Sequence, residues 1–268
     1  MVIEPRNNRA EARVCSCSEA CHVCRGSKFV LEKDEAGREA ARMCQCELRR
    51  IRVRMYNEAG VPGKYYLARL DDRFKDRENE DVFNTFKLLA SDFQPGQKGI
   101  LVMGPSGVGK TFLVAAFIHD VIFRRGKPAH FRDFFHLLAD LRSGYSQDKP
   151  ESELISPLVE VDVLVIDELG KGRNTAWEQN ILDVIISQRY NNQKTTIFTS
   201  NYTASRSTTL VEKVRGKDGI SPDGEGETRD TLLDRVGPRI YSRLKEMCDF
   251  LNLMGTDRRD IEGELKQG

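Results

Sequence analysis

Few folds can accommodate the segment from Gly104 to Thr111 of this 268-residue chain. It reads Gly-Pro-Ser-Gly-Val-Gly-Lys-Thr and matches the phosphate-binding pattern G-x-x-x-x-G-K-[ST]. The apolar run 99–103 before it predicts a strand, and the apolar residues spaced through 111–124 predict a buried helix. In such a strand–loop–helix unit, backbone N–H groups and the helix N-terminus surround phosphate oxygens. The residues expected to hold the phosphates of a nucleotide are Gly104, Pro105, Ser106, Gly107, Val108, Gly109, Lys110 and Thr111.

Short apolar runs alternate with longer amphipathic segments after residue 98. Further strands are expected at 130–131, 161–166, 195–199 and 250–253, and further helices at 134–141, 175–190 and 232–247. The strands are almost entirely apolar, which is typical of a parallel sheet covered by helices on both faces. Two helices are also predicted ahead of the sheet, at 47–58 and 81–93. The expected fold class is therefore α/β, with a three-layer P-loop domain built on a parallel sheet.

The strand expected at 161–166 is followed by two adjacent acids, Asp167 and Glu168. Ligands of α/β sheets bind at the carboxyl ends of the strands, so both acids should lie beside the phosphate loop. Lys110 is expected to reach the β- and γ-phosphates, and Thr111 and Asp167 to hold Mg²⁺. Glu168 is expected to polarise the attacking water. Two acids in succession favour hydrolysis over a simple nucleotide switch.

Asn201 follows the strand expected at 195–199. A polar side chain there would point into the crevice between the two motifs, where it would orient the attacking water or sense the γ-phosphate. Asparagine after a strand is also common as a turn residue, so both interpretations stay open.

Six of the seven cysteines lie within residues 15–46. The spacings Cys21-x2-Cys24 and Cys44-x-Cys46 are typical of two metal-binding knuckles. Four thiolates suit tetrahedral zinc, and a segment this short needs a metal to fold without a large core. We therefore expect one Zn²⁺ bound by Cys21, Cys24, Cys44 and Cys46.

Other interpretations of the cysteine-rich segment stay open. Cys15 and Cys17 would replace the first pair, bind a second ion or bind nothing, and His22 is a further candidate ligand. An iron–sulfur cluster also fits cysteine ligation, and six inert thiols would need no metal at all.

Composition limits the partners of the chain. Lys and Arg number 42 against 41 Asp and Glu, a net charge of +1, which excludes a histone-like basic protein. Any contact with nucleic acid must come from a local patch such as the arginines within 49–54. The sequence lacks an apolar run long enough to span a membrane and an apolar N-terminal signal, so we expect a cytoplasmic protein without membrane contact.

The domain boundary is expected near the joint formed by Gly60, Pro62 and Gly63. Residues 1–58 would form a cysteine-rich zinc module with a basic helix, and residues 59–268 the nucleotide-binding domain. The segment 213–229 is rich in glycine and charge and predicts a mobile loop of unassigned role.

These motifs, in this order, resemble the AAA+ ATPases, and most closely the helicase-loader and transposition-helper group typified by DnaC, DnaI and IstB. The resemblance covers about residues 47–255 and implies ATP binding and ATPase activity. Only residues 255–268 follow the last expected strand, too few for the helical lid of many AAA+ proteins. Loaders of the DnaC type also lack that lid. The resemblance rests on the octet of the phosphate-binding pattern, residues 104–111, and on the segments 59–62, 166–170, 198–202 and 239–244.

The segment 239–244 includes Ser242-Arg243-Leu244. In this group the arginine of that element acts on the nucleotide of a neighbouring subunit. The resemblance therefore implies Arg243 as an arginine finger, Arg239 as the alternative, and a homo-oligomer that assembles with ATP.

The resemblance also implies a function in DNA metabolism. The first hypothesis is an ATP-dependent loader that places a replicative helicase on single-stranded DNA during DNA replication. The alternative is an IstB-like transposition helper that remodels target DNA, and a signalling NTPase is a third possibility. Tyr145, in an expected Ser-Gly-Tyr-Ser loop, is the best candidate to stack on a DNA base.

Overall fold

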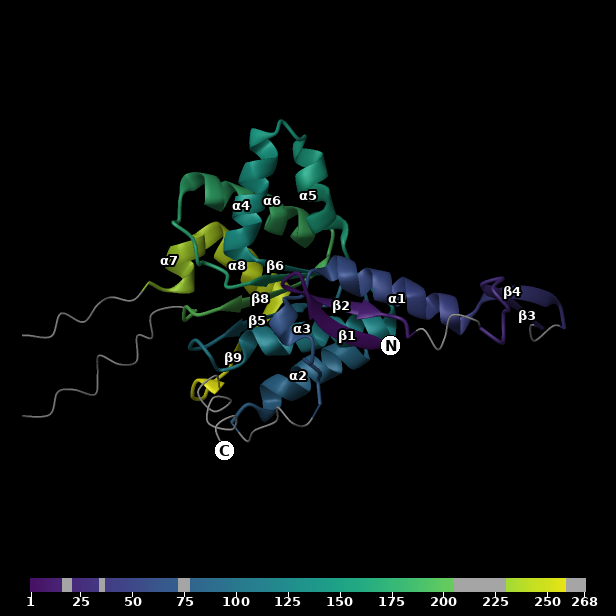
Figure 1. Ribbon diagram of the computed structural model, residues 1–268. Helices are drawn as coiled ribbons and strands as arrows, with labels where there is room; N and C mark the ends of the chain where they lie inside the picture. The colour runs from purple at the N-terminus through teal and green to yellow at the C-terminus, as the bar shows by residue number, and fades with distance from the viewer. Residues whose placement is uncertain (16–20, 34–36, 72–77, 205–229, 259–268) are drawn as a thin grey trace, which may run out of the picture.

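Figure 1 shows the ribbon of the computed structural model of this chain. Cys17 and the loop expected at 213–229 lie outside the described residues. No helix within the described parts of the chain is long and apolar enough to cross a membrane. The structure describes residues 1–15, 21–33, 37–71, 78–204 and 230–258.

A five-stranded parallel sheet forms the centre of the molecule, in the order β6-β7-β8-β5-β9. β8 therefore lies between β5, the strand before the phosphate loop, and β7, the strand that ends at Asp167. All these strands end at one edge of the sheet, which confirms the expected α/β class. The strands are β5 (Gly99–Met103), β6 (Ala129–Asp133), β7 (Val163–Asp167), β8 (Thr195–Ser200) and β9 (Cys248–Asn252).

Both faces of the sheet are buried. Successive side chains of a strand point to opposite faces, so Ile100 and Val102 join one hydrophobic core while Leu101 and Met103 join the other. The first core is covered by α1 (Gln45–Ala59), α2 (Glu80–Ser91), α3 (Lys110–Asp120) and the π-helical turn η4 (Val121–Arg125). The second is covered by α4 (Phe134–Ser146), α5 (Glu151–Glu160), α6 (Ala176–Asn191), α7 (Leu232–Val236) and α8 (Pro238–Met247). The expected three layers are thus present.

The first thirteen residues pack against the P-loop domain. They form an antiparallel hairpin of β1 (Val2–Arg6) and β2 (Arg9–Arg13), whose Ala10 and Ala12 are buried in the first core. The Asn57 side chain of α1 accepts a hydrogen bond from Ala12 N at 2.7 Å and donates one to its carbonyl at 3.0 Å. Ala10 N also donates to the carbonyl of Val61, near the short 3-10 helix η2 (Gly63–Tyr65). One hydrophobic core therefore continues from the N-terminal hairpin through α1 into the sheet.

The cysteine-rich part is a separate, smaller element. It comprises the turns of residues 21–28, which carry Cys21 and Cys24, and the antiparallel hairpin β3 (Phe29–Lys33) and β4 (Glu39–Met43), and it lies at the N-terminal end of α1. Figure 1 shows this hairpin projecting away from the central sheet. Its exposed apolar side chains include Phe29 and Leu31, so it has little core of its own.

Two local expectations are wrong. The helix expected at 232–247 is two helices, because Pro238 begins α8 and its ring nitrogen cannot continue the hydrogen-bond ladder of α7. Tyr145 lies inside helix α4 rather than in a loop, and its half-buried ring packs edge-on against Trp177 at 6.4 Å between centroids. That contact explains its aromatic character without a nucleic-acid base.

Candidate nucleotide-binding site

The octet forms the loop that joins β5 to α3, as its sequence predicts. Helix α3 begins at Lys110, so its first N–H groups face the loop. Gly107 has a φ of +87°, and a Cβ built there would lie 2.1 Å from the side chain of Asp257, so only glycine fits this position. Arg258 N donates to the carbonyl of Gly107 at 3.1 Å. The loop is therefore braced by the segment that follows β9.

The buried Lys110 side chain folds across this loop. Its Nζ donates to the carbonyl oxygens of Gly104 at 2.8 Å and Pro105 at 2.6 Å. A phosphate oxygen is a stronger partner for an ammonium group than a carbonyl, because both charges contribute. The position and donors of Lys110 thus fit the phosphates of a nucleotide.

Asp167 lies at the centre of a polar network beside the loop. Its two carboxylate oxygens lie 3.2 and 3.1 Å from the hydroxyl of Thr111, and Oδ1 accepts from the hydroxyl of Thr199 at 2.5 Å. Burial is the main cause that raises the pKa of Asp167 to about 6. Hard cations prefer oxygen ligands, so the Thr111 hydroxyl and the Asp167 carboxylate suit Mg²⁺. Bound there, Mg²⁺ would neutralise charge on the phosphates.

Glu168 begins a turn directly after β7. Its φ of +57° is unusual for a residue other than glycine, and its backbone N–H donates to the Thr199 hydroxyl at 2.9 Å. Its carboxylate forms an ion pair with Lys171, and this contact is the first cause that raises the pKa of Lys171. Glu168 therefore lies at the carboxyl end of β7, as expected. Its cationic neighbour Lys171 was not predicted from the sequence.

Thr199 is a site residue that the sequence analysis missed. It joins the Asp167 carboxylate to the backbone of Glu168, whereas Asn201 lies one residue beyond β8 and is exposed. Thr199 lies level with Asp167, because it follows the Ile166–Phe198 pair of β7 and β8. This placement depends on the order of the strands, so the sequence alone carries no signal for it. A role for Asn201 in orienting water stays a prediction.

Arg243 and Arg239 lie one turn apart on α8. Arg243 donates to Asp183 of α6 at 2.6 Å, and its side chain is 22% exposed. Arg239 lies 3.6 Å from the same carboxylate and is 74% exposed. The structure therefore anchors Arg243 and leaves the side chain of Arg239 more exposed.

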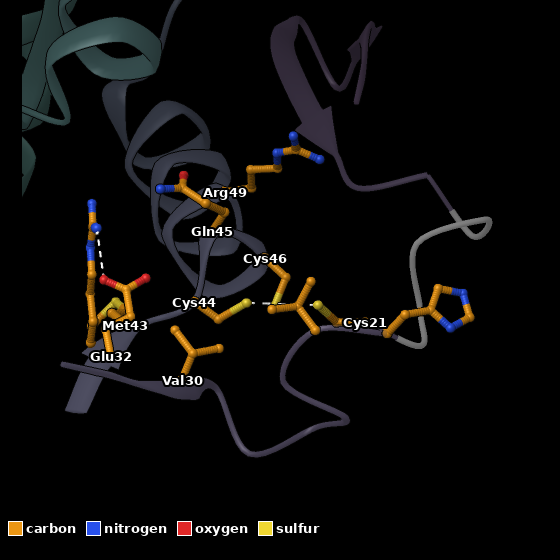
Figure 2. Close-up of a pocket in the computed structure, with 11 residues that line it drawn as sticks. Cys21, Val30, Glu32, Met43, Cys44, Gln45, Cys46 and Arg49 are labelled. Atoms are coloured by element: carbon orange, nitrogen blue, oxygen red, sulfur yellow. Dashed lines mark hydrogen bonds and ion pairs between the residues drawn. The ribbon is translucent and has the colours of Figure 1, made fainter. Parts of the chain in front are cut away.

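The four cysteines expected to bind zinc come together. Their sulfurs all lie within 4.8 Å of one another, with Cys21–Cys44 at 3.7 Å and Cys24–Cys46 at 3.4 Å. A tetrahedral site with Zn–S bonds of about 2.3 Å needs sulfurs roughly 3.8 Å apart, so the group fits zinc. Figure 2 shows the sulfurs of Cys21, Cys44 and Cys46 turned toward one another. Among the described residues, Cys15 does not belong to this cluster of possible metal ligands.

The local backbone also favours thiolates. Hydrogen bonds from the backbone of Cys24 and Val23 lower the pKa of Cys21 to about 6, and a backbone bond from Gly26 lowers that of Cys24. The pKa of Cys46 is raised to about 12, first by its contact with Cys24. A divalent cation among the sulfurs reverses such a rise because it stabilises every thiolate. His22 is exposed at the edge of this cluster.

The arginines of α1 make several contacts within the protein. Arg52 donates to the carbonyl of Phe123 at 2.9 Å, and Arg50 lies 3.8 Å from Glu47. These contacts explain part of the basic run without nucleic acid.

The sheet order and the network between the phosphate loop and β7 define a P-loop ATP-binding domain of the AAA+ class. A family model described as IstB-like ATP binding protein matches residues 29–212, and the chain belongs to this family. The resemblance to the DnaC, DnaI and IstB group is thereby confirmed.

Three curated relatives illustrate the range of the family. The uncharacterized protein YqaM of Bacillus subtilis is 21% identical over 238 residues, which cover 84% of this chain and 67% of that protein. The replicative helicase loader DnaC of Escherichia coli K12 is 21% identical over 69% of this chain and 77% of its own length. The putative ATP-binding protein Rv3427c of a Mycobacterium tuberculosis insertion sequence is 33% identical over 39% of this chain and 41% of its own length.

Solved structures agree with this assignment. A crystal structure of the DnaC helicase loader matches with a TM-score of 0.58 and 27% identity, over 71% of this chain and 99% of that one. A crystal structure of DnaI matches with a TM-score of 0.52 and 20% identity, over 74% and 93%, which supports the fold.

Proposed function

We propose that this chain is an ATPase that loads a replicative helicase onto single-stranded DNA. The observation that carries the ATPase part is the Thr111–Asp167–Thr199 network, which joins the phosphate loop to the turn of Glu168. ATP would bind with its phosphates in the loop and its γ-phosphate toward Glu168. Asn201 would lie beside the attacking water.

The reaction needs one proton acceptor. Water attacks the γ-phosphorus and forms a new P–O bond, while its proton passes to the Glu168 carboxylate. The bond from the γ-phosphorus to the bridging oxygen breaks, and ADP and inorganic phosphate leave. Lys110 stabilises charge on the phosphates throughout. Arg243 of a neighbouring subunit, in an assembly formed with ATP, would add a further positive charge at the γ-phosphate.

Two variants separate binding from chemistry. Lys110→Ala should lose nucleotide affinity, because the phosphates lose their cationic partner. Glu168→Gln should bind ATP normally and lose most hydrolysis, because glutamine cannot accept the proton. Binding of a fluorescent ATP analogue and release of phosphate measure the two steps. Normal hydrolysis by Glu168→Gln would contradict the assignment.

The loading role rests on the relatives and on the cysteine module. The module projects from the P-loop domain and exposes Val23 by 74%, Phe29 by 51% and Leu31 by 72%. Apolar groups exposed this way suit contact with a protein partner. We propose that zinc organises this module and that its apolar side chains contact the helicase.

The IstB-like family model and the insertion-sequence relative favour a second candidate, a transposition helper that remodels target DNA. The two functions predict different stimulation of the ATPase. Single-stranded DNA together with the helicase of the same organism should stimulate a loader, whereas duplex DNA together with a transposase should stimulate a helper. A Leu31→Ser variant should lose helicase stimulation alone if the module is the contact. Stimulation by duplex and transposase alone would reject the loader.

A further inference from the structure

The turn after β7 must be held by its surroundings. Glu168 adopts the left-handed region of backbone conformation, which disfavours residues with a Cβ, and Gly170 has a φ of +89°. One side of the turn is fixed by β8: Leu169 N donates to the carbonyl of Thr199 at 2.7 Å, and the Ser200 hydroxyl donates to the carbonyl of Leu169 at 3.0 Å. The turn has two backbone bonds of its own, from Lys171 N to the carbonyl of Glu168 at 3.0 Å and from Gly172 N to the carbonyl of Gly170 at 2.9 Å. On its other side Lys171 pairs with Glu168.

Arg235 of α7 gives the turn a further support. Its Nε donates to the carbonyl of Gly170 at 2.9 Å, and its Nη2 donates to the carbonyl of Gly172. These two carbonyls flank Lys171. The guanidinium also lies over the ring of Tyr202, 5.4 Å from its centre, and the side chain is only 16% exposed. The planar fork of an arginine makes two such bonds at once, which a lysine ammonium cannot reproduce with the same geometry.

Close packing transmits this support to the turn. A Cβ built at Gly170 would lie 3.1 Å from the ring of Tyr202 and 3.3 Å from Cβ of Arg235. Tyr202 and the stem of Arg235 therefore lie close to the turn at Gly170 and leave little room there for a larger residue. The next residue in this turn, Lys171, forms an ion pair with the Glu168 carboxylate.

Helix α7 has anchors of its own. Leu232 and Val236 are buried, and Leu232 N donates to the carbonyl of Thr203 at 2.8 Å. Thr231 and Asp234 form a capping box at the start of the helix. Removal of the Arg235 side chain should therefore leave α7 docked while it releases the turn.

We propose that Arg235 is a positioning residue for ATP hydrolysis, which holds the carbonyls of Gly170 and Gly172 and thereby fixes the turn that presents Glu168 to water. This inference rests on the ATPase activity proposed above. Arg235 touches neither the phosphate loop nor Asp167 in its hydrogen bonds, so its effect should fall on the chemical step and spare nucleotide binding.

The test compares Arg235→Ala and Arg235→Lys with Arg173→Ala, which removes an exposed arginine next to the same turn. Steady-state phosphate release gives kcat and KM, a fluorescent ATP analogue gives Kd, and thermal unfolding gives Tm. A small misplacement of a catalytic group costs up to about 100-fold in rate, so Arg235→Ala should lower kcat by roughly 10- to 100-fold. Its KM and Kd should stay within about 2-fold of the wild type. Arg173→Ala should match the wild type.

Rescue separates positioning from folding. Arg235→Lys should recover little activity although it keeps the charge, whereas millimolar methylguanidinium should partly restore kcat in Arg235→Ala and leave Glu168→Gln inactive. The proposal is overturned if Arg235→Ala keeps the wild-type kcat, if Kd weakens as much as kcat falls, or if the lost rate only follows a lost folded fraction without rescue. If the wild type itself hydrolyses no ATP, the proposed function fails first, which is a distinct result.

Discussion

The buried carboxylate of Asp167 should make the nucleotide-free protein less stable than an asparagine would. Asp167 is 5% exposed, and burial is the main cause that raises its pKa from 3.8 to about 6. The charges of Glu168 and Asp133 add to the rise, and the threonine hydrogen bonds oppose it. A tenfold change in proton affinity is worth about 1.4 kcal/mol, so ionised Asp167 costs the folded state roughly 3 kcal/mol at neutral pH.

Asparagine can take the same place without leaving a polar group unpaired. Its carbonyl can accept from one of the hydroxyls of Thr111 and Thr199, and its amide can donate to the other, because a hydroxyl both donates and accepts. We therefore expect Asp167→Asn to raise the free energy of unfolding by about 1–3 kcal/mol, which is several degrees of Tm in a domain of this size. The same variant should lose Mg²⁺-dependent hydrolysis.

The pH dependence tests the cause. Between pH 3.8 and about 6 the folded state binds more protons at Asp167 than the unfolded state does, so wild-type stability falls as pH rises through this window. The advantage of Asp167→Asn in urea unfolding should be full above pH 6 and shrink toward pH 4. Asp249→Asn, on an exposed position of β9, is the control and should change stability by less than about 0.5 kcal/mol. No advantage at pH 7, or an advantage independent of pH, would refute the reasoning.

Three further predictions concern other parts of the chain. A strong chelator should release about one zinc per chain and unfold the β3–β4 module, which faster amide hydrogen exchange in that module would show. The Tm of the P-loop domain should stay unchanged, and absence of metal from the protein would contradict the prediction. Arg189→Lys should lower the free energy of unfolding by about 2–4 kcal/mol, because the fully buried guanidinium donates to four backbone carbonyls and to Thr196. An unchanged free energy of unfolding in urea would contradict this prediction. Arg243→Ala should bind ATP and hydrolyse it up to about 10³-fold more slowly. Asp183→Asn, which breaks the same ion pair, should keep the rate, and equal loss in both variants would reject the finger.

The sequence predicts the parts of the site that follow from local rules. The octet needs a strand before it and a helix after it, and the acids at 167–168 must end a strand, so the sheet edge that holds them follows. The placement of Thr199 depends on which strands are neighbours, and strand order is a long-range property. No residue pattern in or near β8 predicts that this strand lies between β5 and β7.

Long-range packing also explains why the sequence does not reveal the N-terminal hairpin or the contacts of Arg235. The hairpin of residues 2–13 is short and half polar, and its place is fixed by Asn57 and by burial of two small alanines under α1. Arg235 shows no signal in the sequence, because its partners are backbone carbonyls 63 and 65 positions away. Backbone partners of this kind leave no residue pattern to recognise.

Helix α1 links the cysteine module mechanically to the P-loop domain. Cys44 is the N-cap of α1 and Cys46 lies in its first turn, so a metal bound by the four cysteines would be attached to the helix itself. The 15 residues of α1 span about 22 Å at 1.5 Å per residue. The far end is held by Asn57 against the N-terminal hairpin and by Arg132 of β6, whose guanidinium donates to the carbonyl of Ala59 at 3.5 Å. The module and the core of the P-loop domain are therefore joined by one continuous helix, whose C-terminal end contacts β6, the neighbour of the strand that carries Asp167.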